Sequence, residues 1–228
     1  TVCNVGGYST DAVAQHTFAM LFYLLEKLPY YDRYVKDEKY IGDKMFTHFD
    51  KHFGELAKMT WGIIGLGNIG RRVADIAKAF GCRVIYYSTS GRNSQPGYER
   101  VSFEELLKES DIVSVHAPLD ENTLDLMNKE AFHQMKKTAI FLNLGRGPIV
   151  VEEDLAEALE QGEIAAAGLD VLRVEPMSPE NPLRRIKDSE KLLITPHIAW
   201  ASVEARPRLM EIICGQIQEF FYNGSPES

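Results

Sequence analysis

The 228-residue sequence lacks several features that would each indicate a class of protein. Its cysteines, Cys3, Cys82 and Cys214, are odd in number, widely spaced and without a CxxC pair, so we expect neither a disulfide framework nor a zinc site. This usage favours a reducing, cytoplasmic setting. No apolar run approaches the length of a membrane-spanning helix, which is about 20 residues. Long basic runs are also missing from a chain of net charge −8, which argues against nucleic-acid or membrane partners.

The sequence also has no initiator methionine, because it opens on TVCNVGGYST. We therefore expect it to begin inside a longer protein, whose true N-terminus and any targeting signal lie outside it. What is present is ordinary for a globular protein, with 45% apolar and 25% charged residues.

Short β-rich runs alternate with amphipathic stretches through most of the chain. Such alternation is typical of a parallel sheet covered on both faces, so the sequence predicts a doubly wound α/β fold. The predicted strands are WGIIG, RVIYYS, DIVSVH, TAIFLN, AAAGLDV and KLLITP, and the helices between them include NIGRRVADIAKAF, SFEELLKES and EEDLAEALEQG.

Further helices are predicted toward both ends of the chain. Residues 9–11 offer N-caps for the apolar stretch AVAQHTFAMLFYLLEKL, which Pro29 should end. A last helix is expected over 202–222, where Pro207 predicts a kink or a late start and Asn223-Gly224 the end.

The stretch GLGNIG follows the first predicted strand and opens a helix. Gly65 allows the tight turn, Gly67 lets a pyrophosphate approach the backbone, and Gly70 lets the helix pack on the strand. The helix start at Asn68 and Ile69 offers free N–H groups to phosphates. The alternative is a plain strand–helix turn, but this position in a βαβ unit favours a Rossmann-type dinucleotide-binding domain.

The end of the second predicted strand departs from the usual dinucleotide site, where an acid bonds the ribose hydroxyls. Ser88 stands in that place, and Thr89, Ser90 and Arg92 follow it. Hydroxyl donors and a guanidinium suit a 2′-phosphate better than a carboxylate does, so NADP is favoured over NAD. The alternative is that they are ordinary polar turn residues before Gly91, with the ribose merely solvated.

Three stretches downstream follow or end predicted strands: NLGRGPIVVEEDL, AAAGLDVLRVEP and LLITPHIAWAS. Because carboxyl ends of parallel strands form the ligand crevice, Arg146, Glu175 and His197 should converge beside the nicotinamide. Arg146 can bind the carboxylate and carbonyl of a 2-keto acid, His197 can donate a proton, and Glu175 would favour the imidazolium. The alternative interpretation, for each residue taken singly, is that Arg146 is a surface arginine of a turn and His197 a core histidine.

Together these stretches resemble the D-isomer-specific 2-hydroxyacid dehydrogenase family. Their sequences look closest to those of its hydroxypyruvate reductase and glycerate dehydrogenase branch. The match runs from NVGGYSTDAVAQHTFAM through GIIGLGNIGRRVA and DIVSVHAPLDENTLDLMN to TPHIAWASVEAR. It implies an oxidoreductase that transfers a hydride between NADP or NAD and a small 2-keto or D-2-hydroxy acid such as hydroxypyruvate or glyoxylate. The implied catalytic residues are Arg146, Glu175 and His197, and the implied cofactor contacts are Gly65, Gly67, Asn68, Ile69, Gly70, Ala117, Pro118, Thr123, Leu144, Gly145, Arg146, Asp170 and His197.

One departure from the family is large. Its members begin with a segment that forms most of a substrate domain, which this chain does not contain, so we expect the chain to bind dinucleotide yet turn over poorly by itself. The expected organisation is a first helix and dimerisation segment at 1–58, a dinucleotide-binding core at 59–200, and a helix at 201–228 that returns toward the substrate domain.

The segment from Phe18 to Phe53 holds 10 of the chain's 23 aromatic residues without a clean period. Such enrichment suits an interface, and the matching family segment contacts a partner subunit, so we expect a homodimer. The alternative is an extension of the core.

Two other functions share these features. A dinucleotide-sensing module, like the corepressors of this fold, would keep the same residue set, although the acidic composition and the absence of extra tails weigh against it. A purely structural, dimerising domain is a third reading. The particular 2-hydroxy acid cannot be read from this chain.

The remaining histidines carry weaker signals. His48 and His52 have the i, i+4 spacing of a metal pair, but no third ligand accompanies them, so we interpret them as a solvated helix face and expect no metal. His16 is interpreted as structural, His133 as a surface residue of a polar helix, and the role of His116 is left open.

Overall fold

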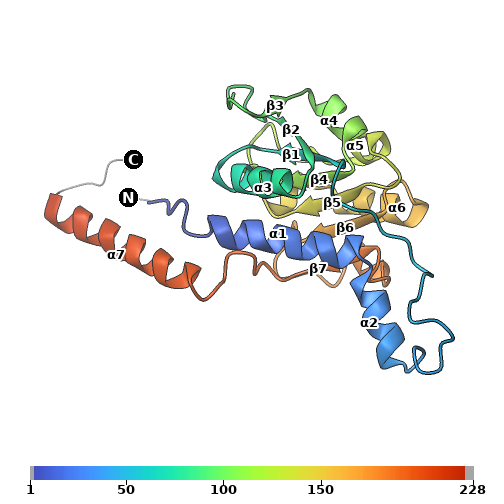
Figure 1. Ribbon diagram of the computed structural model, residues 1–228. Coiled ribbons are helices and arrows are strands. Elements are labelled where there is room, and N and C mark those ends of the chain that lie inside the picture. The colour runs from blue at the N-terminus through green and yellow to red at the C-terminus, as the bar shows by residue number, and fades with distance from the viewer. Residues whose placement is uncertain (1–2, 224–228) are drawn as a thin grey trace.

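The computed structural model describes residues 3–223 and has a seven-stranded sheet at its centre (Figure 1). The strand order is β3-β2-β1-β4-β5-β6-β7 and every pairing is parallel, so the doubly wound α/β prediction is confirmed. The order reverses between β1 and β4, the point at which such sheets open a ligand crevice. The strands are β1 Thr60–Ile64, β2 Arg83–Tyr87, β3 Glu99–Arg100, β4 Ile112–Val115, β5 Ile140–Asn143, β6 Ala166–Leu169 and β7 Leu192–Ile194.

Helices cover both faces of the sheet (Figure 1). Neighbouring strand residues point to opposite faces, so Ile63 joins the core under α1 and α3 while Ile64 joins the core under α4, α5 and α6. The central strands are therefore buried on both sides, which explains their continuous apolar runs. The helices of this body are α1 Thr10–Leu25, α3 Asn68–Ala79, α4 Phe103–Glu109, α5 Lys129–Gln134 and α6 Glu152–Gln161, with 3-10 turns η1 Gly147–Ile149 and η2 Pro182–Arg185.

All six predicted strands are present, and among the strands of residues 3–223 the edge strand β3 was not predicted. This strand consists of Glu99 and Arg100, which are both exposed. A two-residue charged strand has no apolar signal, because neither of its faces is buried.

The first predicted helix was drawn too long, and the expected role of Pro29 was wrong. The α1 helix ends at Leu25, and Lys27 adopts a left-handed conformation with φ 54°. Pro29 lies in the first turn of a second helix, α2 Leu28–Lys36. A proline costs little there, because the first N–H groups of a helix have no intrahelical partner.

The expectation that His48 and His52 share a helix face was also wrong. Residues 37–58 form turns and irregular chain without a helix. His48 stacks on Tyr34 with ring centroids 3.8 Å apart, and its Nε2 lies 2.8 Å from the hydroxyl of Tyr30. Aromatic stacking rather than helical periodicity organises this segment.

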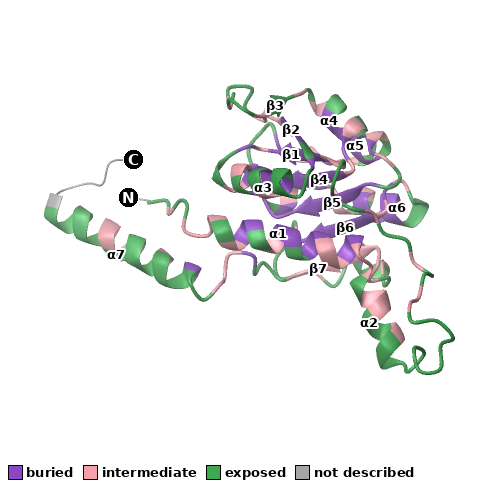
Figure 2. Ribbon diagram, in the orientation of Figure 1, coloured by how far each residue is buried: buried purple, intermediate pink, exposed green. Residues whose placement is uncertain are grey.

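Two parts project from the body (Figure 1). One is α2 with the loop that follows it. The other is α7 Ala205–Asn223, which runs beside the N-terminal residues, where Gln216 donates to the carbonyl of Asn4 at 2.9 Å. The late start predicted from Pro207 is confirmed, whereas Gly224 lies outside the described residues. Both projections are largely exposed (Figure 2). No helix among residues 3–223 is long and apolar enough to cross a membrane.

Candidate active site

The glycine-rich turn between β1 and α3 is shaped by two glycines and left open at a third. Gly65 has φ +90°, and a Cβ atom there would lie 2.7 Å from the Cα of Ala117. A Cβ on Gly70 would lie 2.3 Å from the carbonyl oxygen of Gly65. A Cβ on Gly67 would meet nothing within 4 Å. Gly65 and Gly70 therefore serve the fold, whereas Gly67 leaves free space at the mouth of the turn.

That free space lies at the N-terminus of α3. No side chain caps this helix, so the N–H groups of Asn68 and Ile69 remain available. Available donors and a positive helix end are what a pyrophosphate requires. The turn after β5 reaches the same place, because a Cβ on Gly145 would lie 2.9 Å from the carbonyl oxygen of Ala117. The ends of β1, β4 and β5 thus lie against one another at the reversal of strand order, the point at which sheets of this type bind ligands.

The loop after β2 is more ordered than its polar sequence suggests. Ser88 is only 3% exposed, and its Oγ accepts the backbone N–H of Asn93 at 3.1 Å. The Oγ of Ser90 accepts the N–H of Arg92 at 3.3 Å. Ser88 and Ser90 therefore shape the loop, and the guanidinium of Arg92, together with partly exposed Thr89, faces solvent.

Sequence reasoning missed Asn93, which ties this loop to the glycine-rich turn. Its Nδ2 donates to the carbonyl oxygen of Leu66 at 2.9 Å, and its Oδ1 accepts Nε2 of Gln95 at 2.8 Å. This bond ties the loop after β2 to the glycine-rich turn. An asparagine in a polar turn carries no signal for such a contact, because its partner is 27 residues away.

The turn after β4 is closed on itself. Thr123 is fully buried, and its hydroxyl donates to the carbonyl oxygen of Pro118 at 2.8 Å. It also accepts the N–H of Asp120 at 2.8 Å. The hydroxyl of Thr123 therefore shapes the edge of the crevice, next to buried Ala117 and exposed Pro118.

The turn after β5 presents Arg146. Asn143 is fully buried, its Oδ1 accepts the N–H of Gly145 at 3.1 Å, and its Nδ2 donates to the carbonyl oxygen of Arg146 at 3.0 Å. Leu144 is buried between them. The arginine side chain is left exposed, so its guanidinium can receive an anionic ligand.

Gly147 brings the turn after β5 against the loop after β6. A Cβ atom on Gly147 would lie 1.9 Å from the carbonyl carbon of Leu172. Only glycine fits this contact, and it places the arginine turn beside the loop that carries Glu175.

Asp170, at the end of β6, organises the loop after β7. It is 2% exposed, and its two carboxylate oxygens accept the backbone N–H groups of Ile198 at 3.0 Å and Ala199 at 2.9 Å. Its backbone oxygen accepts the N–H of His197 at 2.8 Å. His197 has φ 54°, a left-handed conformation that these bonds hold in place.

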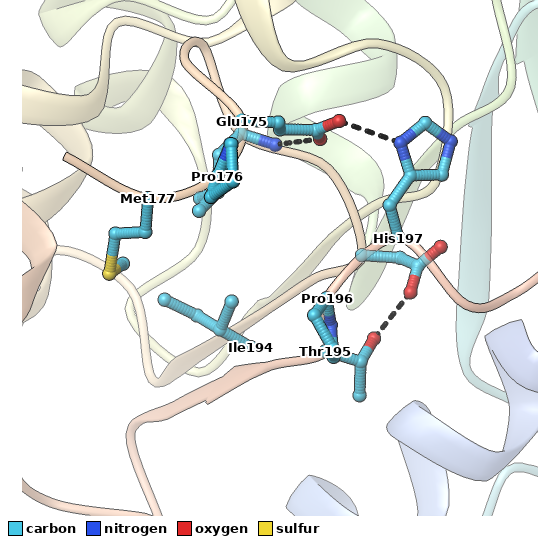
Figure 3. A pocket seen from close by; sticks show the side chains of 9 residues that line it. Glu175, Pro176, Met177, Ile194, Thr195, Pro196 and His197 are labelled. Carbon is cyan, nitrogen blue, oxygen red and sulfur yellow. Dashed lines mark hydrogen bonds and ion pairs between the residues drawn. The ribbon is translucent and has the colours of Figure 1, made fainter.

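His197 and Glu175 form a pair at the rim of a pocket of about 520 Å³ (Figure 3). The imidazole Nδ1 lies 2.7 Å from the Oε2 of Glu175, and both side chains are partly exposed. Nδ1–H therefore donates to the carboxylate, and Nε2 on the opposite edge of the ring is free to face a ligand. The pocket is lined on its other side by Pro176, Met177 and Ile194.

The pKa of Glu175 lies below its ordinary value. Partial burial acts to raise this pKa, but the hydrogen bonds from His197 and from the N–H of Leu172 outweigh it, helped by the positive charges of His197 and Arg146. Glu175 is thus a carboxylate near neutral pH, and such a neighbour stabilises the imidazolium form of a histidine.

His116, whose role was left open, lies below the crevice. Its Nε2 is 3.1 Å from the hydroxyl of Ser114, which accepts the indole N–H of Trp61 at 2.9 Å. Burial lowers the pKa of His116 to about 3, so the ring is neutral. The surface prediction for His133 is confirmed, because its side chain is 79% exposed on α5.

Comparison with known proteins gives the family. Residues 18–199 match the model of the D-isomer specific 2-hydroxyacid dehydrogenase, NAD binding domain. The chain belongs to this family. The family resemblance and the predicted enzyme class, an NAD(P)-dependent oxidoreductase that transfers a hydride to and from 2-hydroxy acids, are therefore confirmed. This dehydrogenase also carries the Rossmann-type domain that was predicted.

Relatives of this dehydrogenase use both nicotinamide dinucleotides. It is 38% identical to a hydroxypyruvate reductase from Blautia hydrogenotrophica over 99% of the chain and 69% of that protein. Its fold matches a D-lactate dehydrogenase from Aquifex aeolicus complexed with NAD and lactic acid, with a TM-score of 0.86, 29% identity, and coverage of 96% of this chain and 68% of the other. It also matches an NADPH-dependent glyoxylate/hydroxypyruvate reductase from Sinorhizobium meliloti in complex with NADP and malonate, with a TM-score of 0.85, 27% identity, and coverage of 99% and 68%.

Proposed function

We propose that this dehydrogenase reduces a small 2-keto acid such as hydroxypyruvate or glyoxylate, with Arg146, Glu175 and His197 as its catalytic residues. The observation that carries the proposal is the 2.7 Å pair between His197 and Glu175, held beside Asp170 at the carboxyl ends of the strands. The printed activities of relatives support the substrate class, since a hydroxypyruvate reductase and a glyoxylate/hydroxypyruvate reductase are among them.

Each side chain has one role in the proposed reaction. A bound nicotinamide dinucleotide supplies the hydride to the carbonyl carbon. His197 gives the Nε2 proton to the carbonyl oxygen, which becomes the hydroxyl, and takes it back in the reverse direction. Glu175 keeps the ring oriented and favours its protonated form, and Arg146 binds the carboxylate and polarises the carbonyl.

NADP is the proposed cofactor, with NAD as a weaker alternative. The β2 end has no acid to repel a 2′-phosphate, and the guanidinium of Arg92 is exposed within the same loop. The glycine-rich residues 65–70, together with the turns at Ala117, Pro118 and Thr123 and at Leu144 and Gly145, would hold the rest of the dinucleotide, and Asp170 would lie near the nicotinamide.

A homodimer through α2 and residues 37–58 is also proposed. Phe46 is 90% exposed and Phe49 is 67% exposed in this segment, an arrangement that favours burial against a second copy. Light scattering at micromolar concentration should give twice the chain mass, whereas a clean monomer would contradict the dimer.

A cytoplasmic location is proposed because Cys3, Cys82 and Cys214 are all free thiols. The division into 1–58, 59–200 and 201–228 stays a prediction.

The decisive experiment is an assay of the full-length protein with hydroxypyruvate, glyoxylate, pyruvate and longer 2-keto acids, each with NADPH and with NADH. We expect turnover of at least one small keto acid and a higher kcat/KM with NADPH. A kcat/KM that favours NADH by about tenfold or more contradicts the phosphate site, since it corresponds to a preference of about 1.4 kcal/mol for the cofactor without a 2′-phosphate. Tight dinucleotide binding without turnover of any keto acid would instead favour a dinucleotide-sensing protein.

A further inference from the structure

His16, which was predicted to be structural, lies at the outer end of a hydrogen-bonded chain that reaches Asp170 in the candidate active site. It is a residue of α1, a helix that packs on β5, β6 and β7. Its Nε2 lies 3.0 Å from the hydroxyl oxygen of Thr195 and 3.7 Å from Oδ1 of Asp170. Its side chain is 21% exposed, so most of the ring is enclosed.

The directions of these bonds follow from counting donors. Thr195 has one hydroxyl proton, and it donates that proton to Oδ1 of Asp170 at 2.5 Å. Its oxygen can then only accept from His16, so Nε2 of His16 carries a proton. The chain of donation therefore runs from His16 to Thr195 to Asp170.

This chain ends on the backbone that carries His197. Asp170 accepts the N–H groups of Ile198 and Ala199, and the loop between Thr195 and Ala199 holds His197 in its left-handed conformation. Losing the donor on α1 removes a restraint from Thr195 and Asp170 together, since both depend on the same short path.

We propose that His16 is a positioning residue for the reaction, which acts through Thr195 and Asp170 to hold the loop that carries His197 in its working conformation. This inference rests on the proposed role of His197. It assigns His16 no contact with substrate or cofactor. The helix that carries His16 is distant in sequence from the loop it contacts, since His16 and Thr195 are 179 positions apart.

The test compares two substitutions in the full-length protein. H16L keeps much of the side-chain volume but loses the donor, and H16Q carries an amide N–H at about the reach of Nε2. We expect H16L to lower kcat about tenfold, the equivalent of one lost hydrogen bond of about 1.4 kcal/mol, with H16Q recovering most of it. The NADPH dissociation constant should change less than about threefold, because the glycine-rich turn is untouched.

A matched control is Thr17→Val, the next residue of α1. Thr17 is fully buried and donates its hydroxyl to the carbonyl oxygen of Val13 at 2.8 Å, a bond within the helix. T17V should leave kcat and its KM values unchanged even if its melting temperature shifts. An equal loss of kcat in T17V would reduce the effect of H16L to general destabilisation and overturn the proposal.

A second readout does not depend on activity. Amide hydrogen exchange at Ile198 and Ala199 should be about tenfold faster in H16L than in wild type and should be close to wild type in H16Q. Adding His16→Leu to a Thr195→Val protein should cause little further change, because without the Thr195 hydroxyl His16 has lost its path to Asp170. Unchanged exchange in H16L, or fully additive effects, would overturn the role of His16. Normal turnover of a His197→Ala protein, by contrast, would overturn the proposed proton donor and leave the exchange result in place.

Discussion

Two regions at the carboxyl ends of the strands are built differently: the glycine-rich turn with its neighbours, and the loops that carry Asp170 and His197. Around Gly65 and Ala117 the contacts are between backbone and small side chains, which approach closely because Cβ atoms are missing, and Gly67 leaves open space beside them. Around Asp170 and His197 the walls are side chains bonded to one another and to backbone N–H groups. The first region should therefore be sensitive to added atoms, and the second to lost donors and acceptors.

The largest expected effect is on the loops that carry Asp170 and His197. His197→Ala in the full-length protein should lower kcat by about 10²–10⁴-fold, because the proton donor is removed while the crevice for the dinucleotide remains. Steady-state kinetics and a fluorescence titration with NADPH measure the two quantities. His133→Ala, at an exposed histidine on α5, is the matched control. A variant with near-normal turnover would end the assignment of His197.

The glycine-rich turn can be tested with two of its glycines. Gly67→Ala should fold normally but raise the dinucleotide dissociation constant about tenfold or more, because its methyl group would occupy the free space at the end of α3. Gly70→Ala should lower the free energy of unfolding by about 1–3 kcal/mol, since its Cβ would press on the carbonyl oxygen of Gly65. Equilibrium unfolding in urea and binding titrations separate the two. Equal effects of both substitutions on stability would contradict this division of roles.

A smaller effect is expected at the end of β2. Arg92→Ala should raise the KM for NADPH about tenfold with little change for NADH, because a charge-assisted bond to phosphate is worth about 1.5–3 kcal/mol. Ser88→Asp should shift preference toward NADH, since a carboxylate there repels a 2′-phosphate. Equal changes for both dinucleotides in Arg92→Ala would show that the guanidinium does not read the phosphate.

The smallest expected effect is a shift in the pH dependence of kcat/KM for keto-acid reduction. In Glu175→Gln the ring of His197 loses the carboxylate beside Nδ1, so keto-acid reduction should begin to fail at a lower pH than in wild type. The profile of kcat/KM against pH measures this. An unchanged profile would mean that Glu175 has another role.

Glu175→Gln should also change how the free energy of unfolding depends on pH. Because the pKa of Glu175 is lower in the folded protein than in the unfolded chain, its carboxylate stabilises the fold above the unfolded pKa of about 4.3, and this contribution is lost as the pH falls through the folded value. The difference in unfolding free energy between wild type and Glu175→Gln, measured by urea unfolding at a series of pH values, should therefore shrink as the pH falls below about 4.3.

How far the sequence predicts this molecule depends on how local each signal is. The glycine-rich turn and the six main strands were predictable, because a turn and its flanking apolar runs are contiguous. The roles of Asn93, His16 and Gly147 were not, since each acts through a partner distant along the chain. Their residue types are common in turns and helices, so nothing in the sequence marks them.

The wrong helix predictions lie in one region for a related reason. Between Leu25 and Thr60 the chain packs little against the sheet, so burial imposes no period on its residues. Pro29 and His48 were interpreted by helix rules, whereas a left-handed residue at Lys27 and aromatic stacking decide their conformations.

The contact between Gly147 and Leu172 has a consequence for how substrate range can change in this dehydrogenase. Since two backbones touch there, the separation between the main chain of the arginine turn and that of the loop that carries Glu175 is set by the main chain itself. Substitutions at pocket residues such as Met177 or Ile194 can alter the size and polarity of the acceptor without moving the chemical groups apart. Substitutions that change substrate specificity at these pocket residues can therefore leave the backbone positions of the catalytic loops unchanged.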